Sequence, residues 1–187
     1  VYSFEPEPGN YALLLHNIEL NGYQSIVPVN EALSIQSGVA TLFLTALDSG
    51  RHSIYPSGLP SKGTVEITTN TADAFLETQG WPEVDLVKID VEGSEMDVLS
   101  GMGQLLRKSS KLNLIVELNP VLLQSAGVDP LAFLQNPLHL GSDALGFDVC
   151  CIDEGKGHLA LGEIGIGQLV ERLLANEESV NLHYSKR

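Results

Sequence analysis

The stretch DLVKIDVEGSE, residues 85–95, constrains the fold more than any other part of this sequence. A short, largely apolar run ends at Asp90, and two further carboxylates, Glu92 and Glu95, follow closely. Apolar residues at helical spacing then predict an amphipathic helix over 94–108, with Ser94 as its cap. A buried strand that leads directly into a helix is typical of an α/β sheet. The carboxylates therefore fall at the carboxyl end of a buried strand.

The rest of the chain alternates between strand and helix in the same way. Predicted strands lie at 1–5, 25–33, 85–90, 112–118, 147–153 and 180–185. Helical spacing recurs between most of them, as in the apolar stripe of Tyr11, Leu14, Leu15 and Ile18. Residues 34–69 are rich in Ser, Gly and Thr and predict a hairpin or loop excursion over the sheet. The pattern favours an open α/β sheet with helices on both faces. At 187 residues and 43% hydrophobic content, the chain suits one domain over 1–187.

The composition excludes some partners. Ten basic residues face 24 acidic ones, and the net charge of -14 is repelled by nucleic acid and by anionic membranes. No apolar run reaches the roughly 18 residues that a membrane span needs. The adjacent Cys150 and Cys151 point to opposite faces of a predicted strand, which is typical of buried thiols in a reducing compartment. We therefore expect a cytoplasmic protein that neither binds nucleic acid nor inserts into a membrane.

Four carboxylates are predicted to meet at one edge of the sheet. In open α/β sheets, ligands bind beyond the carboxyl ends of the strands. Glu5 ends the first predicted strand, Asp90 and Glu92 follow the strand at 85–90, and Glu117 lies near the end of the next one. Buried carboxylates are costly without donors, a cation or a hydroxylated ligand. This edge is therefore the predicted functional site.

Individual residues at this edge allow more than one interpretation. A carboxylate in the position of Glu5 typically accepts hydrogen bonds from a ribose diol, although an acid at a helix start is the simpler interpretation. Lys88 alternates with Asp90 on one face of a strand that is expected to be buried on both faces, so it forms either a buried ion pair or part of the site. Glu95 is interpreted as a solvated acid in the first turn of a helix.

Four segments in order resemble the FkbM family of S-adenosylmethionine-dependent methyltransferases. They are FEPEPGNYALLLHNIELNG, EALS, VDLVKIDVEGSEMDVLSGM and LIVELNP, and the similarity covers most of the chain. The resemblance implies a Rossmann-like class I methyltransferase sheet with an antiparallel last strand. It also implies methyl transfer from S-adenosylmethionine to a hydroxyl oxygen of a small molecule, sugar or glycolipid.

The resemblance assigns roles to particular residues. Glu5 would hold the ribose hydroxyls of the cofactor, and the segment Asn30, Glu31, Ala32 would lie against the adenine. Asp90 and Glu92 would face the methionine end and the acceptor hydroxyl, and Lys88 is kept with them as a candidate catalytic residue. A carboxylate there suits the positive charge of S-adenosylmethionine and can take a proton from a hydroxyl. No metal is expected.

The sequence departs from the family in one respect. Family members have a first strand and a Gly-rich turn before the ribose-binding acid, and both are missing here. The missing strand would lie between those at 1–5 and 85–90, so two strand edges are expected to lack a partner. Three explanations are open: the sequence is the C-terminal portion of a longer domain, another strand substitutes, or the domain no longer binds cofactor.

Two other functions remain as alternatives. A degenerate domain of the same fold would only bind or scaffold. An acidic pocket on an α/β sheet, as in receiver or phosphatase-like domains, would instead hold Mg²⁺ through Asp90, Glu92 and Glu117. The sequence identifies neither the methyl acceptor nor the oligomeric state.

Overall fold

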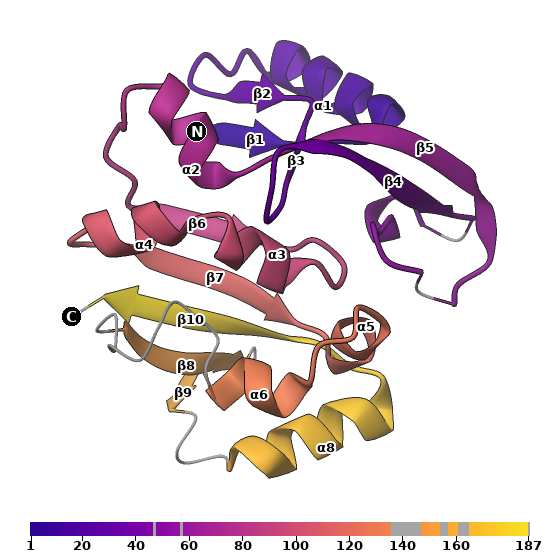
Figure 1. Ribbon diagram of the computed structural model, residues 1–187, viewed down its shortest axis with the longest axis vertical. Helices are drawn as coiled ribbons and strands as arrows, with labels where there is room; N and C mark the ends of the chain where they lie inside the picture. The colour runs from indigo at the N-terminus through magenta and orange to yellow at the C-terminus, as the bar shows by residue number, and fades with distance from the viewer. Residues whose placement is uncertain (47, 57, 136–146, 154–156, 161–164, 187) are drawn as a thin grey trace.

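The computed structural model describes residues 1–46, 48–56, 58–135, 147–153, 157–160 and 165–186. Strands and helices alternate along this part of the chain (Figure 1). The strands are β1 (Tyr2–Phe4), β2 (Val27–Val29), β3 (Ala32–Leu33), β4 (Gly38–Thr45), β5 (Ser61–Asn70), β6 (Leu86–Ile89), β7 (Asn113–Leu118), β8 (Phe147–Asp153), β9 (Gly157–Ala160) and β10 (Val180–Lys186). The helices are α1 (Pro8–Asn21), the 3-10 helix η1 (Ser49–Arg51), α2 (Ala72–Thr78), α3 (Glu95–Ser100), α4 (Gly103–Lys108), α5 (Pro120–Ser125), α6 (Pro130–Gln135) and α8 (Ile166–Asn176).

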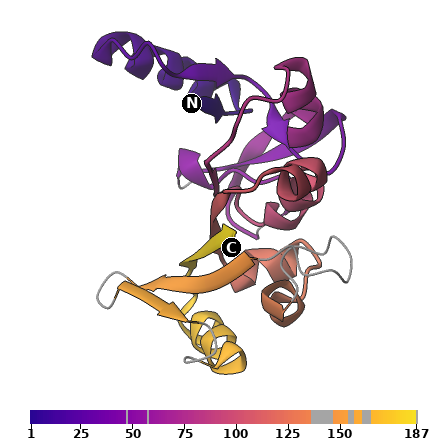
Figure 2. The same ribbon diagram turned by 90° about the vertical axis from the view of Figure 1, so that its left-hand side faces the viewer.

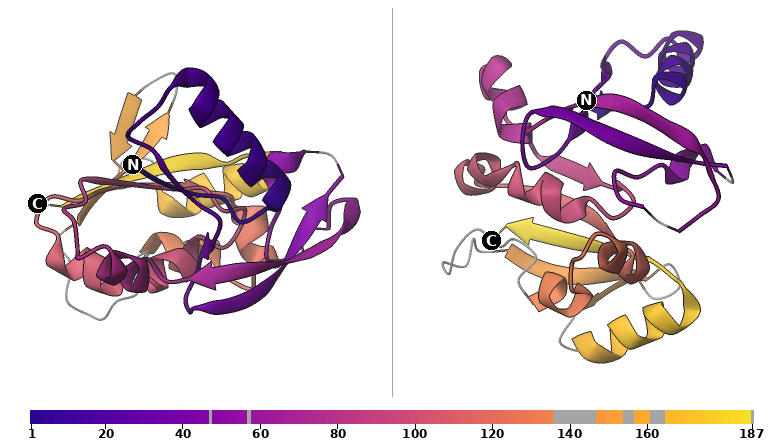
Figure 3. Two further views of the ribbon diagram at one scale, coloured as in Figure 1. Left: turned by 90° about the horizontal axis from the view of Figure 1, so that it is seen from above. Right: turned by 45° about the vertical axis from the view of Figure 1, so that its right-hand side comes forward.

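The strands form three sheets. The largest has the order β6-β7-β10-β8-β9, in which β6 and β7 are parallel and β10 runs antiparallel to both β7 and β8. β1 and β2 form a parallel pair, and β3, β5 and β4 form the third sheet. The antiparallel last strand is therefore confirmed, and so is the excursion over 34–69, in which β4 and β5 pair as a long antiparallel hairpin (Figure 3).

The strands β1 and β6 are edges that face each other without pairing. Each is the last strand of its sheet among the described residues, and Figure 1 shows them separated. The sequence predicted two such edges, one at each side of a missing strand. Because β6 has no neighbour on that side, Leu86 is 56% exposed, and the expectation that this strand is buried on both faces is wrong.

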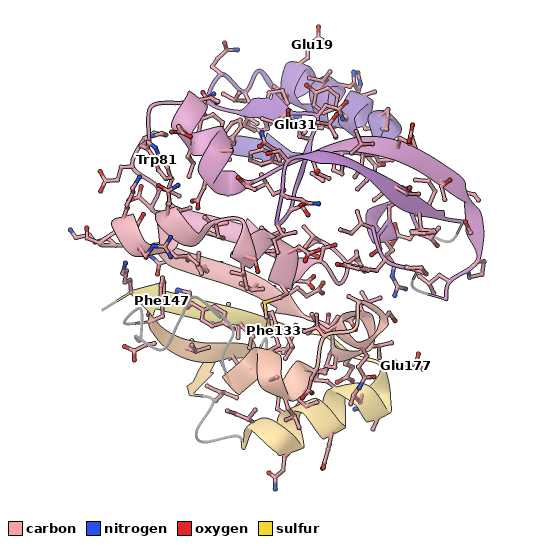
Figure 4. All side chains as sticks on the ribbon, viewed as in Figure 1. Glu19, Glu31, Trp81, Phe133, Phe147 and Glu177 are labelled. Atoms are coloured by element: carbon pink, nitrogen blue, oxygen red, sulfur yellow. The ribbon has the colours of Figure 1, made fainter. Side chains whose placement is uncertain are left out.

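Helices lie on both sides of the strands. Figure 2 shows α1 on one side and α2, α3 and α4 on the other. Tyr2 and Phe4, which share a face of β1, each meet Phe75 of α2 edge to face, with ring centroids 5.0 and 4.9 Å apart. In the large sheet every second residue of β7 is fully buried. The core therefore lies between this sheet and the later helices, where Phe133 of α6 is fully buried (Figure 4).

The predicted helix over 94–108 is two helices, α3 and α4. The helix is interrupted at Gly101, which packs so closely against Ser34 that a Cβ at this position would overlap the Ser34 carbonyl oxygen. The second helix has its own cap, since the Asp73 carboxylate accepts hydrogen bonds from the N–H groups of Gln104 (2.7 Å) and Leu105 (2.9 Å). Ser94 occupies the N-cap position of α3 as predicted, but its hydroxyl donates to the Val91 carbonyl (3.1 Å) and makes no capping hydrogen bond to the helix.

Two smaller predictions also differ from the structure. The predicted apolar stripe of α1 is not packed in a core, since no residue of this helix is buried and Leu15 is 43% exposed. The predicted strand at 25–33 is divided into β2 and β3, which join different sheets. Within the described residues, every helix is too short or too polar to span a lipid bilayer.

Candidate functional site

A cavity of about 840 Å³ opens between β1 and β6 and extends to the carboxyl ends of these strands. Its lining includes most of the residues that the sequence proposed for the site: Glu5, Glu31, Ala32, Lys88, Asp90 and Glu92. The two facing strand edges form its walls, and the apolar residues of α2 and α4 close one side. The acids from β1 and from the loop after β6 therefore share one cavity, as the convergence argument predicted.

Three carboxylates form a cluster at the end of the large sheet. Asp90 follows β6, and Glu117 lies on the neighbouring strand β7. Ile89 pairs with Val116, so Asp90 and Glu117 are the next residues along the two parallel strands. Glu92 completes the group, and carboxylate oxygens of all three lie within 4.8 Å of one another. Burial, together with the negative charges of Glu117 and Asp90, raises the pKa of Glu92 to about 7, although Arg51 opposes the shift. Burial also raises the pKa of Glu117, with Asp90 adding to the effect.

Lys88 does not form the buried ion pair that the sequence suggested as one interpretation. Its Nζ donates to Asp90 Oδ2 at 3.0 Å, but the side chains are 45% and 49% exposed. The pair is open to solvent because no strand covers this edge of β6 in the described part of the chain. Such exposed pairs add little stability, so Lys88 serves here mainly as a nearby positive charge.

Glu5 lies at the end of β1, where both of its sequence interpretations have a structural counterpart. Its Oε1 accepts a hydrogen bond from the Glu7 N–H at 2.9 Å, close to the start of α1, while the helix cap itself is Glu7. The side chain also lines the cavity, and burial raises the pKa of its carboxyl. Glu5 is therefore held in place by the backbone at the cavity wall.

The segment proposed for adenine binding is divided by the structure. Glu31 and Ala32 line the cavity, and Glu31, which Figure 4 labels, accepts a hydrogen bond from the Asn70 side chain at 3.0 Å. Asn30 is not among the lining residues. Its side-chain amide donates to the carbonyls of Glu5 (2.8 Å) and Pro6 (3.2 Å), so that it fixes the turn after β1.

Glu95 is not the solvated helix acid that the sequence predicted. It is 1% exposed, and its Oε1 accepts a hydrogen bond from the Gly93 N–H at 3.1 Å. Burial raises the pKa of this carboxyl, and backbone donors partly offset the shift. The prediction failed because the side chain turns back into its own loop instead of extending along the helix axis.

The excursion brings further residues to the cluster. Ser53 is buried, and its hydroxyl donates to the Glu92 carbonyl at 2.6 Å. The Tyr55 hydroxyl donates to Asp97 of α3 at 2.8 Å. No sequence pattern points to Ser53, because nothing distinguishes it from the many other small polar residues of 34–69. A contact between residues 39 positions apart depends on how the hairpin folds back over the sheet.

The fold and the acidic edge define a class of protein. The chain superimposes on a crystal structure of methyltransferase FkbM from Methylobacillus flagellatus with a TM-score of 0.57, over 98% of this chain and 36% of that one, at 12% identity. The fold is thus that of a Rossmann-like class I methyltransferase. More specifically, the family described as methyltransferase FkbM domain matches residues 1–140, and the chain belongs to this family.

The chain is also similar to a curated methyltransferase. The chain is 30% identical over 131 residues to the hexuronic acid methyltransferase AglP of Haloferax volcanii. The match covers 70% of this chain and 49% of the relative, so the chain spans about half the length of the protein it resembles.

Proposed function

We propose that the protein transfers a methyl group from S-adenosylmethionine to a hydroxyl oxygen of a sugar or another small hydroxylated acceptor. One observation carries the proposal: acids from two separate strands line one cavity, and a third strand adds Glu117 to the cluster beside it. The family and the hexuronic acid methyltransferase support the reaction and the acceptor class. Cytoplasmic location fits a reaction that uses this donor.

The residues present fit the cofactor. A cavity of about 840 Å³ is within the usual range for small-molecule sites. Carboxylates accept hydrogen bonds from ribose hydroxyls and from an ammonium group, and they favour a positive charge nearby. In this proposal Glu5 holds the ribose, Glu31 and Ala32 lie toward the base, and Asp90 lies toward the charged end. S-adenosylmethionine supplies the activated methyl group.

The acceptor hydroxyl needs help to lose its proton, and Glu92 is suited to take it. Its pKa of about 7 lies near physiological pH, so the carboxylate is present and is still basic enough to be an effective general base. Such assistance is worth roughly 10²–10⁴-fold. Asp90 and Glu117 sustain this basicity by their negative charge, and Lys88 balances the charge of Asp90.

The proposal is tested by following labelled methyl groups from S-adenosylmethionine into a panel of acceptors. The panel contains glycosides of glucuronic acid and of glucose, which share hydroxyls but differ in the carboxylate. Mild alkali separates the two possible products, because it releases methanol from a methyl ester but not from a methyl ether. Alkali-stable label that depends on Glu92 is expected, and alkali-labile label would show that the carboxylate is the acceptor.

Matched variants make this assay specific. Glu92→Gln should lower turnover by at least about 100-fold. Glu77→Gln, on an exposed position of α2, should leave turnover unchanged. Binding of S-adenosylmethionine without transfer to any acceptor would favour the alternative of a binding or scaffolding domain. Parallel reactions with EDTA and with Mg²⁺ test the alternative in which Asp90, Glu92 and Glu117 hold Mg²⁺ through their carboxylate oxygens.

A further inference from the structure

The loop that carries Glu92 has an unusual backbone. Glu92 has φ 53° and Gly93 has φ 101°, so two consecutive residues lie in the left-handed region. Only glycine suits the second position, because a Cβ there would come within 2.9 Å of the Leu122 carbonyl oxygen. Glu92, in contrast, has a side chain and is strained in this conformation. Its surroundings must therefore hold it there.

Two buried side chains hold the peptide unit between these residues. The Glu92 carbonyl accepts a hydrogen bond from the Ser53 hydroxyl at 2.6 Å, and the Gly93 N–H donates to Glu95 Oε1 at 3.1 Å. Both groups of one peptide plane are thus bound, one from the excursion and one from the start of α3. Ser53 is 3% exposed and Glu95 is 1% exposed, so water competes little for either bond.

We infer that Ser53 and Glu95 are positioning residues, which clamp the Glu92–Gly93 peptide so that the Glu92 carboxylate is directed to Asp90 and Glu117. The inference rests on the proposed function, because it concerns how the proposed base is oriented. Loss of these two bonds would let ψ of Glu92 and φ of Gly93 vary, so that Glu92 would no longer be held in its left-handed conformation. Even a displacement of about 1 Å at a reacting group can cost roughly 100-fold in rate.

The hydrogen bond to the Gly93 N–H also explains why Glu95 is buried. A buried carboxylate is costly, so its burial at the start of α3 needs compensating hydrogen bonds. What the loop requires at this point is an acceptor for the Gly93 N–H. A glutamine would provide such an acceptor without the charge, whereas an alanine would not. This difference separates the positioning role from a simple packing role.

The test combines two variants of Glu95 with one of Ser53 and two controls. Glu95→Ala removes the acceptor, Glu95→Gln keeps an amide oxygen for the Gly93 N–H, and Ser53→Ala releases the other end of the peptide. Glu77→Ala and Ser110→Ala, both at exposed positions, are the matched controls. Each protein is measured for turnover, for calorimetric affinity toward S-adenosylmethionine, and for hydrogen exchange of the Gly93 amide by NMR.

We expect Glu95→Ala to lower kcat by roughly 10- to 100-fold, while the affinity for S-adenosylmethionine stays within about twofold. The Gly93 amide should exchange about tenfold faster than in the original protein. Glu95→Gln should restore most of the turnover and of the protection. Ser53→Ala should lower kcat without changing affinity. The two controls should match the original protein in all three measurements.

Other outcomes would overturn the inference. Unchanged Gly93 exchange in Glu95→Ala would show that the bond is not maintained in solution, and unchanged kcat would show that it does not matter. Equal losses of kcat, affinity and melting temperature in all three site variants would indicate a structural role only. If Glu95→Ala does not fold, Ser53→Ala and Glu95→Gln still test whether these residues position the Glu92–Gly93 peptide. If no acceptor is methylated at all, the proposed function fails, whereas Gly93 exchange still tests the clamp.

Discussion

Replacing Glu92 by glutamine should make the folded protein more stable at neutral and alkaline pH. The folded structure raises the pKa of Glu92 from 4.5 to about 7, through burial and through the charges of Glu117, Asp90 and Glu95. A group whose pKa is raised on folding binds its proton more tightly in the folded state. Its stabilising contribution is complete below pH 4.5 and is lost as the pH rises through 7. Glutamine, which does not ionise, avoids this loss.

The size of the effect follows from the same pKa values. The interval from 4.5 to about 7 corresponds to at most about 3.4 kcal/mol, at 1.36 kcal/mol per pKa unit. Glu92 is only half-buried, and solvent screening reduces the electrostatic part, so about 1–2 kcal/mol is the realistic expectation. Loss of the Glu92 charge also relieves the repulsion on Glu117, which acts in the same direction.

Urea unfolding between pH 4.5 and pH 8.5 measures this difference directly. The free energy of unfolding of Glu92→Gln should equal that of the original protein near pH 4.5 and exceed it by about 1–2 kcal/mol at pH 8. Glu77→Gln, at an exposed position of α2, is the matched control. A stability difference for Glu92→Gln that does not depend on pH would refute the assigned electrostatics, and so would a variant that is less stable at pH 8.

Three further outcomes are expected. Glu5→Ala should weaken S-adenosylmethionine binding by about 1.5–3 kcal/mol in calorimetry, and unchanged affinity would remove Glu5 from the site. Asp90→Asn should lower turnover more than affinity if Asp90 acts on the reacting groups, whereas equal losses would favour a positioning role. Gly101→Ala should lower the urea midpoint by an amount equivalent to about 1–3 kcal/mol, because its Cβ would overlap the Ser34 backbone, and a midpoint unchanged from the original protein would contradict this packing.

The sequence predicted those features that depend on local pattern. Strand β6, the helix start after it and the hairpin of 34–69 were all recognised from periodicity and turn residues. The gathering of Glu5, Asp90 and Glu92 followed from the rule that ligand sites lie beyond the carboxyl ends of parallel strands. This rule needs only the order of elements, so it was accessible without coordinates.

Features that depend on long-range contacts were not accessible in this way. The break between α3 and α4 depends on the Asp73 carboxylate, which lies some 30 residues earlier in the chain and caps the second helix. The burial of Glu95 depends on a backbone donor in a loop whose conformation periodicity does not describe. The exposure of α1 also contradicts its apolar spacing, because spacing shows which residues share a face but not whether anything covers it.

The close spacing of the acidic cluster favours a functional site over a charged surface that only keeps the protein soluble. Acids that only keep a protein soluble gain nothing from lying close together, and they would lower its stability by mutual repulsion. Here Asp90, Glu92 and Glu117 place their oxygens within 4.8 Å, and a strained loop with two buried hydrogen bonds maintains the position of one of them. Burial, together with the same repulsion, raises the pKa of Glu92 to about 7, which suits a group that exchanges protons near neutral pH. Stability and the proposed chemistry are therefore opposed at this residue, and Glu92→Gln should increase the stability while it lowers the turnover.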